Sequence, residues 1–324
     1  MTPPRPLRLG LVGQGVRHSL SPILHTRALE LSVLTGSYTI FDCADDTAAR
    51  AVFAQLRSGE LDGLNVTTPF KALALQSADA WQRTAHHKAG VFTQPANTLF
   101  MLENNLVAAS TDGAGLGAAL LSAQVDLVGK RVLLLGAGGA GQAVAAEVLS
   151  LGAAQLRIAN RSPTPAVALA ERLNTIWPKH AVPQTWGDPQ GLLGIDVVLQ
   201  ATRLGHGQPP LPAVLSQVAA DLDWLPWTAW AKHQPLLADL VYAGDMTPVQ
   251  ALALQRGLRV DNRLTVPPID FAQIHPALPD PSGIVKYFGQ AMLAHQAARS
   301  FALWTGRPVD AVRMLAAILP SHEA

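Results

Sequence analysis

The stretch from Asn65 to Lys71 combines residue types that could take part in proton transfer. Its sequence is Asn-Val-Thr-Thr-Pro-Phe-Lys, a short polar and β-branched segment that ends in a lysine. Pro69 suits the first position of a helix and Thr68 the cap before it, so Lys71 is expected in the first helical turn. A lysine is normally unfavourable there, because a helix begins at the positive end of its dipole. The stretch therefore indicates either a lysine that exchanges protons or an ordinary solvated surface lysine.

Asp112, in the sequence Ser-Thr-Asp-Gly, is a carboxylate that could work with Lys71. An aspartate before a glycine is also a common turn former or helix cap. A lysine and an aspartate at a substrate hydroxyl would suit alcohol oxidation, in which one group moves the proton while a nicotinamide takes the hydride. Five further side chains could give a polyhydroxylated substrate uncharged hydrogen bonds, and each could equally be a cap or turn residue: Ser19, Ser21, Asn65, Thr67 and Asn97.

The glycine-rich segment Gly136–Gly141 fits the binding of a dinucleotide. It has the pattern G-x-G-x-x-G between an expected strand at 131–135 and an expected helix to about residue 151, and a second strand is expected at 155–159. Glycines allow a tight turn and the close approach of a pyrophosphate to the helix N-terminus. Glycine also serves plain turns, so it is the strand-turn-helix context that favours a nucleotide site.

The end of the second strand bears on the choice of nucleotide. NAD-binding proteins usually carry an acidic residue there for the ribose 2′-hydroxyl, whereas this chain has Asn160, Arg161 and Ser162. An arginine beside a hydroxyl suits a 2′-phosphate, which favours NADP over NAD. The alternative is that the three residues cap the next helix.

Strands and helices alternate along most of the chain, which predicts an α/β fold with largely parallel sheets. Its 324 residues favour two domains. A hairpin is expected around Glu103, and the first domain boundary after residue 113. Residues 224–230 are expected in a loop or irregular segment. The segment 263–284 holds five prolines and is expected to be a long loop.

Composition excludes several classes of protein. The net charge is +1, without a basic cluster, which argues against a nucleic-acid partner or an acidic membrane surface. The single cysteine, Cys43, excludes an internal disulfide and a cysteine zinc site, and no other metal site is predicted. The first eight residues lack the apolar core of a signal peptide, and the apolar run 132–154 is interrupted by turn residues. We therefore expect a cytoplasmic protein that does not bind membranes.

Several motifs occur in an order that resembles the shikimate dehydrogenase family. They are Ser-x-Ser-Pro from Ser19, Asn-Val-Thr-x-Pro-x-Lys from Asn65, Asn-Thr from Asn97, Thr-Asp-Gly from Thr111, Gly-Ala-Gly-Gly-Ala from Gly136, Asn-Arg from Asn160, and Met-Leu-x-x-Gln from Met292 to Gln296. Together they span nearly the whole chain, and the motif that ends at Lys71 is the most specific of them.

The resemblance implies an arrangement of domains and an activity. Residues 1–113 would form an α/β substrate-binding and catalytic domain, and 114–262 a Rossmann-type doubly wound NADP-binding domain. Residues 263–284 would be an insertion loop, and 285–324 would hold C-terminal helices that pack back on the first domain. The reaction would be the reversible, NADP-linked oxidation of shikimate to 3-dehydroshikimate in aromatic amino acid biosynthesis.

The resemblance also implies a role for individual residues. Lys71 and Asp112 would be catalytic. The substrate pocket would be lined by Ser19, Ser21, Asn65, Thr67, Asn97, Tyr242 and Gln296. The cofactor would be held by Gly136, Ala137, Gly138, Gly139, Ala140, Gly141, Asn160, Arg161, Ser162 and Thr202.

The chain departs from the family pattern in ways that leave alternatives open. The family's second cofactor arginine falls at Pro165, and the segment Gln200-Ala201-Thr202 is followed by Arg203 where a small residue is usual. Quinate or another hydroxylated ring acid is an alternative substrate, and NAD an alternative cofactor. A non-catalytic, nucleotide-binding regulatory protein is a more distant alternative. Both a monomer and a homodimer are compatible with the sequence.

Overall fold

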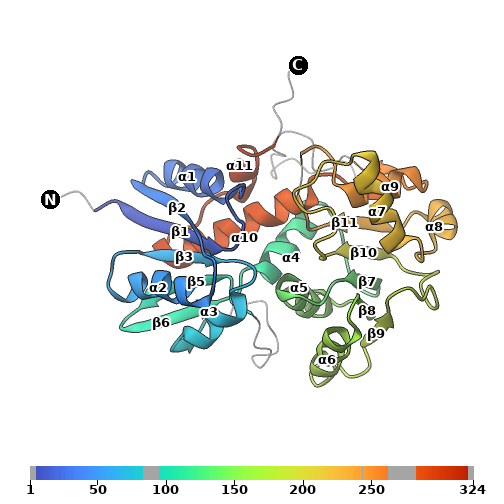
Figure 1. Cartoon of the computed structure of the whole chain (residues 1–324), viewed down its shortest axis with the longest axis horizontal. Coiled ribbons are helices and arrows are strands. Elements are labelled where there is room, and N and C mark those ends of the chain that lie inside the picture. The colour runs from blue at the N-terminus through green and yellow to red at the C-terminus, as the bar shows by residue number, and fades with distance from the viewer. Residues whose placement is uncertain (1–4, 83–94, 243, 262–281, 320–324) are drawn as a thin grey trace, which may run out of the picture. The chain divides into compact units, whose positions relative to one another are not determined.

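The computed structural model describes residues 5–82, 95–242, 244–261 and 282–319. The chain divides into two compact units (Figure 1). The first consists of Met1–Leu116 together with Leu293–Leu319, and the second of Gly117–Met292. Most of the expected loop 263–284 lies outside the described residues.

The first unit contains a six-stranded sheet with the order β2-β1-β3-β5-β6-β4. Its strands are β1 (Leu7–Gly13), β2 (Gly36–Asp42), β3 (Gly63–Val66), β4 (Ala80–Trp81), β5 (Thr98–Leu102) and β6 (Asn105–Ala109). Its helices are α1 (Ser21–Leu31), α2 (Asp46–Arg57), α3 (Lys71–Ser77), the start of α4 (Asp112–Ser122), most of α10 (Phe288–Thr305) and α11 (Ala311–Leu315). The predicted hairpin around Glu103 is confirmed, because β5 and β6 pair antiparallel.

The strand pairing brings several chain segments to one edge of this sheet. β1 and β3 are parallel and therefore end at the same edge. β5 is antiparallel to both β3 and β6, so β5 begins and β6 ends at that edge as well. The segments after β1, after β3, before β5 and after β6 emerge there together. They carry Ser19, Thr67, Asn97 and Asp112, which are far apart in the sequence.

The turn before α3 differs from the sequence-based expectation. Thr68 does not cap the helix and Pro69 does not begin it, because α3 begins at Lys71 with Phe70 as its N-cap. The Phe70 N–H donates to the Thr67 carbonyl at 2.9 Å, and the Phe70 side chain is 1% exposed. A turn closed by this hydrogen bond therefore precedes the helix, and the Phe70 ring within it belongs to the core. The position of Lys71 in the first helical turn is confirmed.

The hairpin of β5 and β6 presents apolar side chains to both faces of its sheet. Leu99 belongs to the core that α2 and α3 cover, whereas Phe100 and Val107 pack with Trp304 of α10 on the other face. This alternation follows from the two-residue period of a strand. The C-terminal segment of the chain thus covers one face of the first unit's sheet, as predicted for the C-terminal helices.

The second unit contains a parallel seven-stranded sheet with the order β12-β13-β11-β10-β7-β8-β9. Its strands are β7 (Arg131–Leu135), β8 (Gln155–Asn160), β9 (Ala181–Thr185), β10 (Val197–Gln200), β11 (Leu236–Asp239), β12 (Val260–Asp261) and β13 (Ile284–Val285). Its helices include α5 (Gly139–Ser150), α6 (Pro163–Asn174), α7 (Pro212–Leu222), α8 (Trp227–His233) and α9 (Pro248–Gln255). The strand order reverses between β7 and β10, as in a doubly wound Rossmann-type fold.

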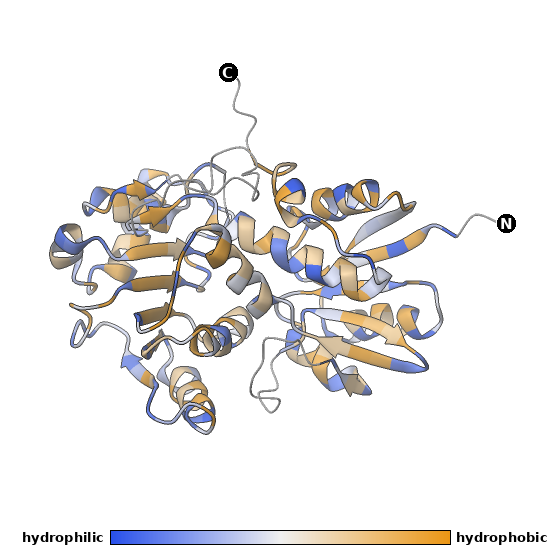
Figure 2. Cartoon of the chain, turned by 180° about the vertical axis from the view of Figure 1, so that it is seen from behind, coloured by the Kyte–Doolittle hydropathy of each residue, from blue (hydrophilic) through white to orange (hydrophobic). Residues whose placement is uncertain are grey.

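The strands of the second sheet are largely apolar, as Figure 2 shows by their colour. All residues of β10 and β11 are buried, as parallel strands covered on both faces should be. The expected irregular segment at 224–230 is partly wrong, because α8 begins at Trp227 and buries Trp230 in the core. Within the described residues, no helix is long and apolar enough to cross a membrane.

Candidate active site

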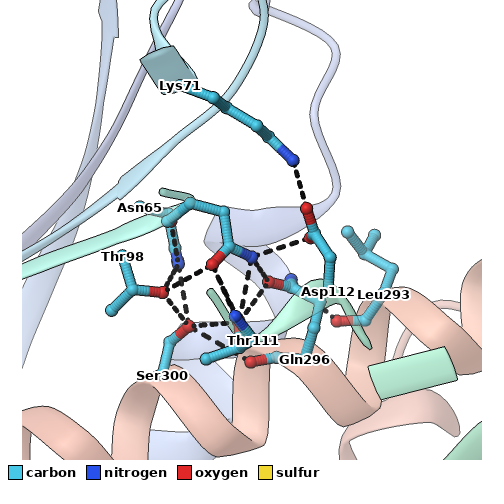
Figure 3. A network of polar contacts seen from close by, with 9 residues as sticks. Asn65, Lys71, Thr98, Thr111, Asp112, Leu293, Gln296 and Ser300 are labelled. Carbon is cyan, nitrogen blue, oxygen red and sulfur yellow. Dashed lines mark hydrogen bonds and ion pairs between the residues drawn. The ribbon is translucent and has the colours of Figure 1, made fainter. Parts of the chain in front are cut away.

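Lys71 and Asp112 form a buried ion pair in the first unit. The Lys71 Nζ donates to the Asp112 Oδ2, and the two side chains are 10% and 9% exposed. Figure 3 shows the lysine pointing its amino group at the carboxylate. Lys71 is the first residue of α3 and Asp112 the first of α4, where a negative charge is favourable. The structure thus brings together the two predicted catalytic residues, although 41 positions separate them.

Asn97 orients the carboxylate of this pair. Its Nδ2 donates to the Asp112 Oδ1 at 2.7 Å and also to the Gln296 Oε1 at 3.1 Å. Its Oδ1 accepts from the Thr111 N–H at 2.8 Å. Asn97 and Gln296 are 3% and 8% exposed. Two predicted substrate residues therefore belong to the network around the Lys71–Asp112 ion pair, and Asn97 restricts the rotation of Asp112.

Asn65 lies in the same polar network but already has a full set of protein partners. Its Oδ1 accepts from the Tyr38 hydroxyl at 2.8 Å and lies 3.0 Å from the Nε2 of His25. Its Nδ2 donates to the Ser300 Oγ at 2.9 Å. Burial lowers the pKa of His25 to about 3, so its imidazole is neutral. Sequence reasoning missed His25, Tyr38 and Ser300, because none of them stands in a recognisable motif.

The remaining predicted substrate residues lie in different parts of the chain. Ser19 and Ser21 are at the start of α1, where the Ser19 hydroxyl donates to that of Ser21 at 3.1 Å. Thr67 follows β3, and its N–H donates to the Val12 carbonyl at 2.8 Å. Thr67 and the serines thus emerge at the sheet edge that carries Lys71. Tyr242 belongs to the second unit, after β11.

Two glycines of the turn in the second unit differ in the space around their backbone: Gly136 is crowded and Gly138 is open. Gly136 has a φ of +107°, and a Cβ there would lie 2.9 Å from the backbone of Ala201. Gly138 caps α5, and a Cβ there would meet no atom within 4 Å. The turn lies at the end of β7, beside the point where the strand order reverses. Such a turn at a helix N-terminus can accept a phosphate.

A cavity of about 480 Å³ adjoins this turn. Five of the predicted cofactor residues line it: Gly136, Gly138, Asn160, Arg161 and Thr202. The other five do not line it: Ala137, Gly139, Ala140, Gly141 and Ser162. Sequence reasoning missed other lining residues, among them Trp186, Arg203, His206, Gln217 and Asp221. Trp186 follows β9, Arg203 and His206 follow β10, and Gln217 and Asp221 lie on α7. Their place at the ends of strands or on this helix is the only feature that could have indicated them.

Two predicted cofactor residues have partners that the sequence did not reveal. The Asn160 Oδ1 accepts from the Ala137 N–H at 3.1 Å, so this amide braces the glycine turn. The Arg161 Nη2 forms an ion pair with the Asp221 Oδ1 at 2.8 Å. Asp221 lies on α7, which the sequence did not predict. In the described residues, no group of three His, Cys, Asp or Glu side chains could hold a metal ion.

Three parts of the chain match known protein families. Residues 11–93 match the shikimate dehydrogenase substrate binding domain, residues 119–203 the shikimate / quinate 5-dehydrogenase domain, and residues 291–319 the shikimate 5′-dehydrogenase C-terminal domain. The shikimate dehydrogenase (NADP(+)) of Thermus thermophilus is 33% identical over 305 residues, which cover 93% of each chain. The chain belongs to the shikimate dehydrogenase family. The family member from Archaeoglobus fulgidus is 30% identical over 94% of each chain.

Solved structures agree with this membership. The shikimate 5-dehydrogenase of Thermus thermophilus, in complex with NADP(H) and shikimate, is 30% identical, with a TM-score of 0.70 over 96% of this chain and 98% of that one. A 5-ketofructose reductase of Gluconobacter sp. strain CHM43 has a TM-score of 0.72 at 23% identity, over 97% and 98% of the two chains. The second likeness shows the fold alone, so the shikimate dehydrogenase fold does not by itself define a substrate.

Proposed function

We propose that this chain catalyses the reversible, NADP-linked oxidation of shikimate to 3-dehydroshikimate, as in aromatic amino acid biosynthesis. The observation that carries the proposal is the buried Lys71–Asp112 ion pair, which Asn97 orients at the edge of the first sheet. Membership of the family supports the reaction, and the Thermus thermophilus relative, which was solved with shikimate and NADP(H), supports both the substrate and the cofactor.

Lys71 can transfer the proton in either direction of the reaction. In the reduction, its ammonium group donates a proton to the ketone oxygen as that oxygen becomes a hydroxyl. In the oxidation, its amine accepts the hydroxyl proton while the alcohol carbon loses hydride and the C=O bond forms. The nicotinamide, when bound, accepts or returns that hydride. Asp112 holds the lysine in place and offsets its charge.

The polar residues at the same sheet edge are proposed to bind the substrate's other oxygens. Ser19, Ser21 and Thr67 carry hydroxyl groups that suit the carboxylate and hydroxyls of a ring acid. Asn97 and Gln296 are proposed to contact the ring hydroxyls nearest the ion pair.

Two further residues have a less direct place in this proposal. Asn65 supports the polar network through its hydrogen bond to Ser300. Neither residue of the ion pair is among its partners, which include Tyr38, His25, the Asn97 carbonyl and Ser300. Tyr242 stays a proposed substrate residue on the resemblance to the family alone.

The cofactor is proposed to bind in the cavity beside the glycine turn. The open space at Gly138 and the close approach of backbone at Gly136 fit a pyrophosphate. Asn160 holds the turn in shape through the Ala137 N–H, and Arg161 lines the same cavity. The residues present therefore fit a dinucleotide, and Arg161 favours its phosphorylated form.

A steady-state assay that crosses shikimate and quinate with NADP and NAD tests this function. We expect the highest kcat/KM with shikimate and NADP. A strong preference for NAD would contradict the proposed cofactor, and turnover of quinate without shikimate would favour the alternative substrate. If wild type and Lys71→Ala are equally inactive on both acids, the non-catalytic alternative gains support.

A further inference from the structure

The nucleotide cavity of the second unit holds two arginines from different strands. Arg161 follows β8 and Arg203 follows β10, and β7 lies between these two strands in the sheet. Both arginines line the same cavity as Gly136, which follows β7 directly. The two arginines therefore enter the space beside the glycine turn from strands on its two sides.

The two arginines differ in their charge environment. Arg161 forms its ion pair with Asp221, and Asp221 lines the cavity too. The positive charge of Arg161 is thus largely offset where a ligand would meet it. Arg203 is exposed and forms no ion pair with any residue that the structure describes. Its charge remains available to an anion.

The loop that carries Arg203 is shaped by contacts within the loop and by the close approach of Pro248. The Thr202 N–H donates to the Gln200 Oε1 at 2.6 Å, and the His206 N–H to the Arg203 carbonyl at 3.1 Å. Gly205 has a φ of +70°, and a Cβ there would lie 2.7 Å from the Pro248 ring. These contacts fix the backbone of Arg203, so its side chain has a defined origin at the cavity.

We propose that Arg203 provides the main cationic contact for the phosphate on the adenosine ribose of the cofactor. This inference rests on the proposed NADP-linked function. It assigns to the loop after β10 the role that the family's second arginine would play at position 165, where this chain has proline. A guanidinium can bind a phosphate with two parallel hydrogen bonds, which a paired arginine offers less readily. Arg203 therefore contributes more than Arg161 to the preference for a 2′-phosphorylated nucleotide.

Calorimetric titration of the full chain with adenosine 2′,5′-bisphosphate and with adenosine 5′-monophosphate tests this role without requiring turnover. Arg203→Ala is expected to weaken binding of the bisphosphate about 10- to 100-fold, as for a lost charge-assisted contact, and that of the monophosphate less than about threefold. Arg203→Lys keeps a point charge and should retain part of the preference. Arg161→Ala should cause a smaller loss than Arg203→Ala, because Asp221 offsets its charge.

Arg259→Ala is the matched control, because Arg259 is exposed in the same unit but does not line the cavity. It should bind both nucleotides as the wild type does. The proposal is overturned if Arg203→Ala weakens both nucleotides equally, or if Arg161→Ala causes the larger loss for the bisphosphate. Equal binding of both nucleotides by the wild type would also overturn it. A chain that discriminates between the nucleotides but oxidises no ring acid would instead contradict the proposed reaction alone.

Discussion

Asp112 in the first unit and Asp239 in the second are both buried carboxylates, at 7% and 0% exposure. Asp112 has a cation beside it, Lys71. Asp239 ends β11 and accepts from the Thr247 hydroxyl at 2.5 Å, the Val241 N–H at 2.9 Å and the Gln200 amide at 3.3 Å. It forms no ion pair with a described residue. Its burial raises its pKa to about 7, against the lowering effect of these hydrogen bonds.

The presence or absence of a cationic partner distinguishes the carboxylate that we propose for the reaction from the one that stabilises the fold. A buried charge is costly unless it is paired, and Lys71 pairs with Asp112. Neutral donors hold Asp239 in place without offsetting a full charge. Asp239 therefore joins β11 to the start of α9, where Thr247 is the N-cap. The same side chain serves two purposes because its neighbours differ in charge.

Removal of the Lys71 ammonium group should have the largest effect on activity and stability. Lys71→Ala is expected to lower kcat by about 10²- to 10⁴-fold, the usual contribution of a proton-transferring group. It should also destabilise the chain by about 3 kcal/mol, because it leaves a buried carboxylate unpaired. Kinetic assays and denaturant unfolding measure both. The matched control is Lys232→Ala, at an exposed lysine of α8; a comparable loss of kcat there would contradict the role of Lys71.

The double variant Lys71→Ala/Asp112→Asn sharpens this comparison. It keeps a neutral acceptor for the Asn97 amide but removes the unpaired charge. Part of the lost stability should return, while kcat should stay low. If stability falls further instead, the carboxylate of Asp112 stabilises the fold without its cation, and the contrast with Asp239 fails.

The free energy of unfolding should depend on pH through the protonation of Asp239. The folded chain holds its proton up to about pH 7, whereas the unfolded chain releases it near pH 4. The folded state binds more protons between these values, so the free energy of unfolding should fall as the pH rises from about 4 to 7, by up to about 4 kcal/mol from this group. Asp239→Asn should remove this component. Identical pH profiles of unfolding for the two proteins would contradict it.

Removal of the Thr247 hydroxyl, which donates to Asp239, should have a smaller effect on stability. Thr247→Ala removes both the hydrogen bond to the carboxylate and the cap of α9, which should cost about 1–2 kcal/mol. It should also raise the pKa of Asp239 further, because this hydrogen bond lowers it. Thr247→Ser keeps the hydroxyl and should retain most of the stability. Thermal unfolding of the three proteins compares them; equal losses for Ala and Ser would point to the lost methyl group instead.

The sequence predicted most of the strands along the chain and the two residues that form the buried ion pair. Local patterns suffice for β5 and β6, because their hairpin is short, and for the glycine turn, whose spacing is specific. The pairing of Lys71 with Asp112 followed from their chemistry and from motif order. The structure then supplied the physical cause, which is that β3, β5 and β6 bring both residues to one edge.

What the sequence did not predict depends on partners that are distant along the chain. α3 begins at Lys71 and not at Pro69, and Phe70 just before it packs into a core whose other members come from distant parts of the chain. Asn160 and Arg161 were expected to face a ligand, yet each also contacts the protein. Asp221, the partner of Arg161, lies 60 positions away. No local pattern marks such a residue.

The first unit is formed from two stretches of chain, residues 1–116 and 293–319, whereas the described part of the second lies between them. During synthesis on the ribosome, this part of the second unit is therefore made before the first unit is complete. Asn65 cannot form its hydrogen bond to Ser300 until that residue, 235 positions later, has been synthesised. The packing of Phe100 against Trp304 depends on α10 in the same way. We expect the nascent N-terminal sheet to keep one apolar face uncovered until α10 has been synthesised, which makes this stage prone to aggregation.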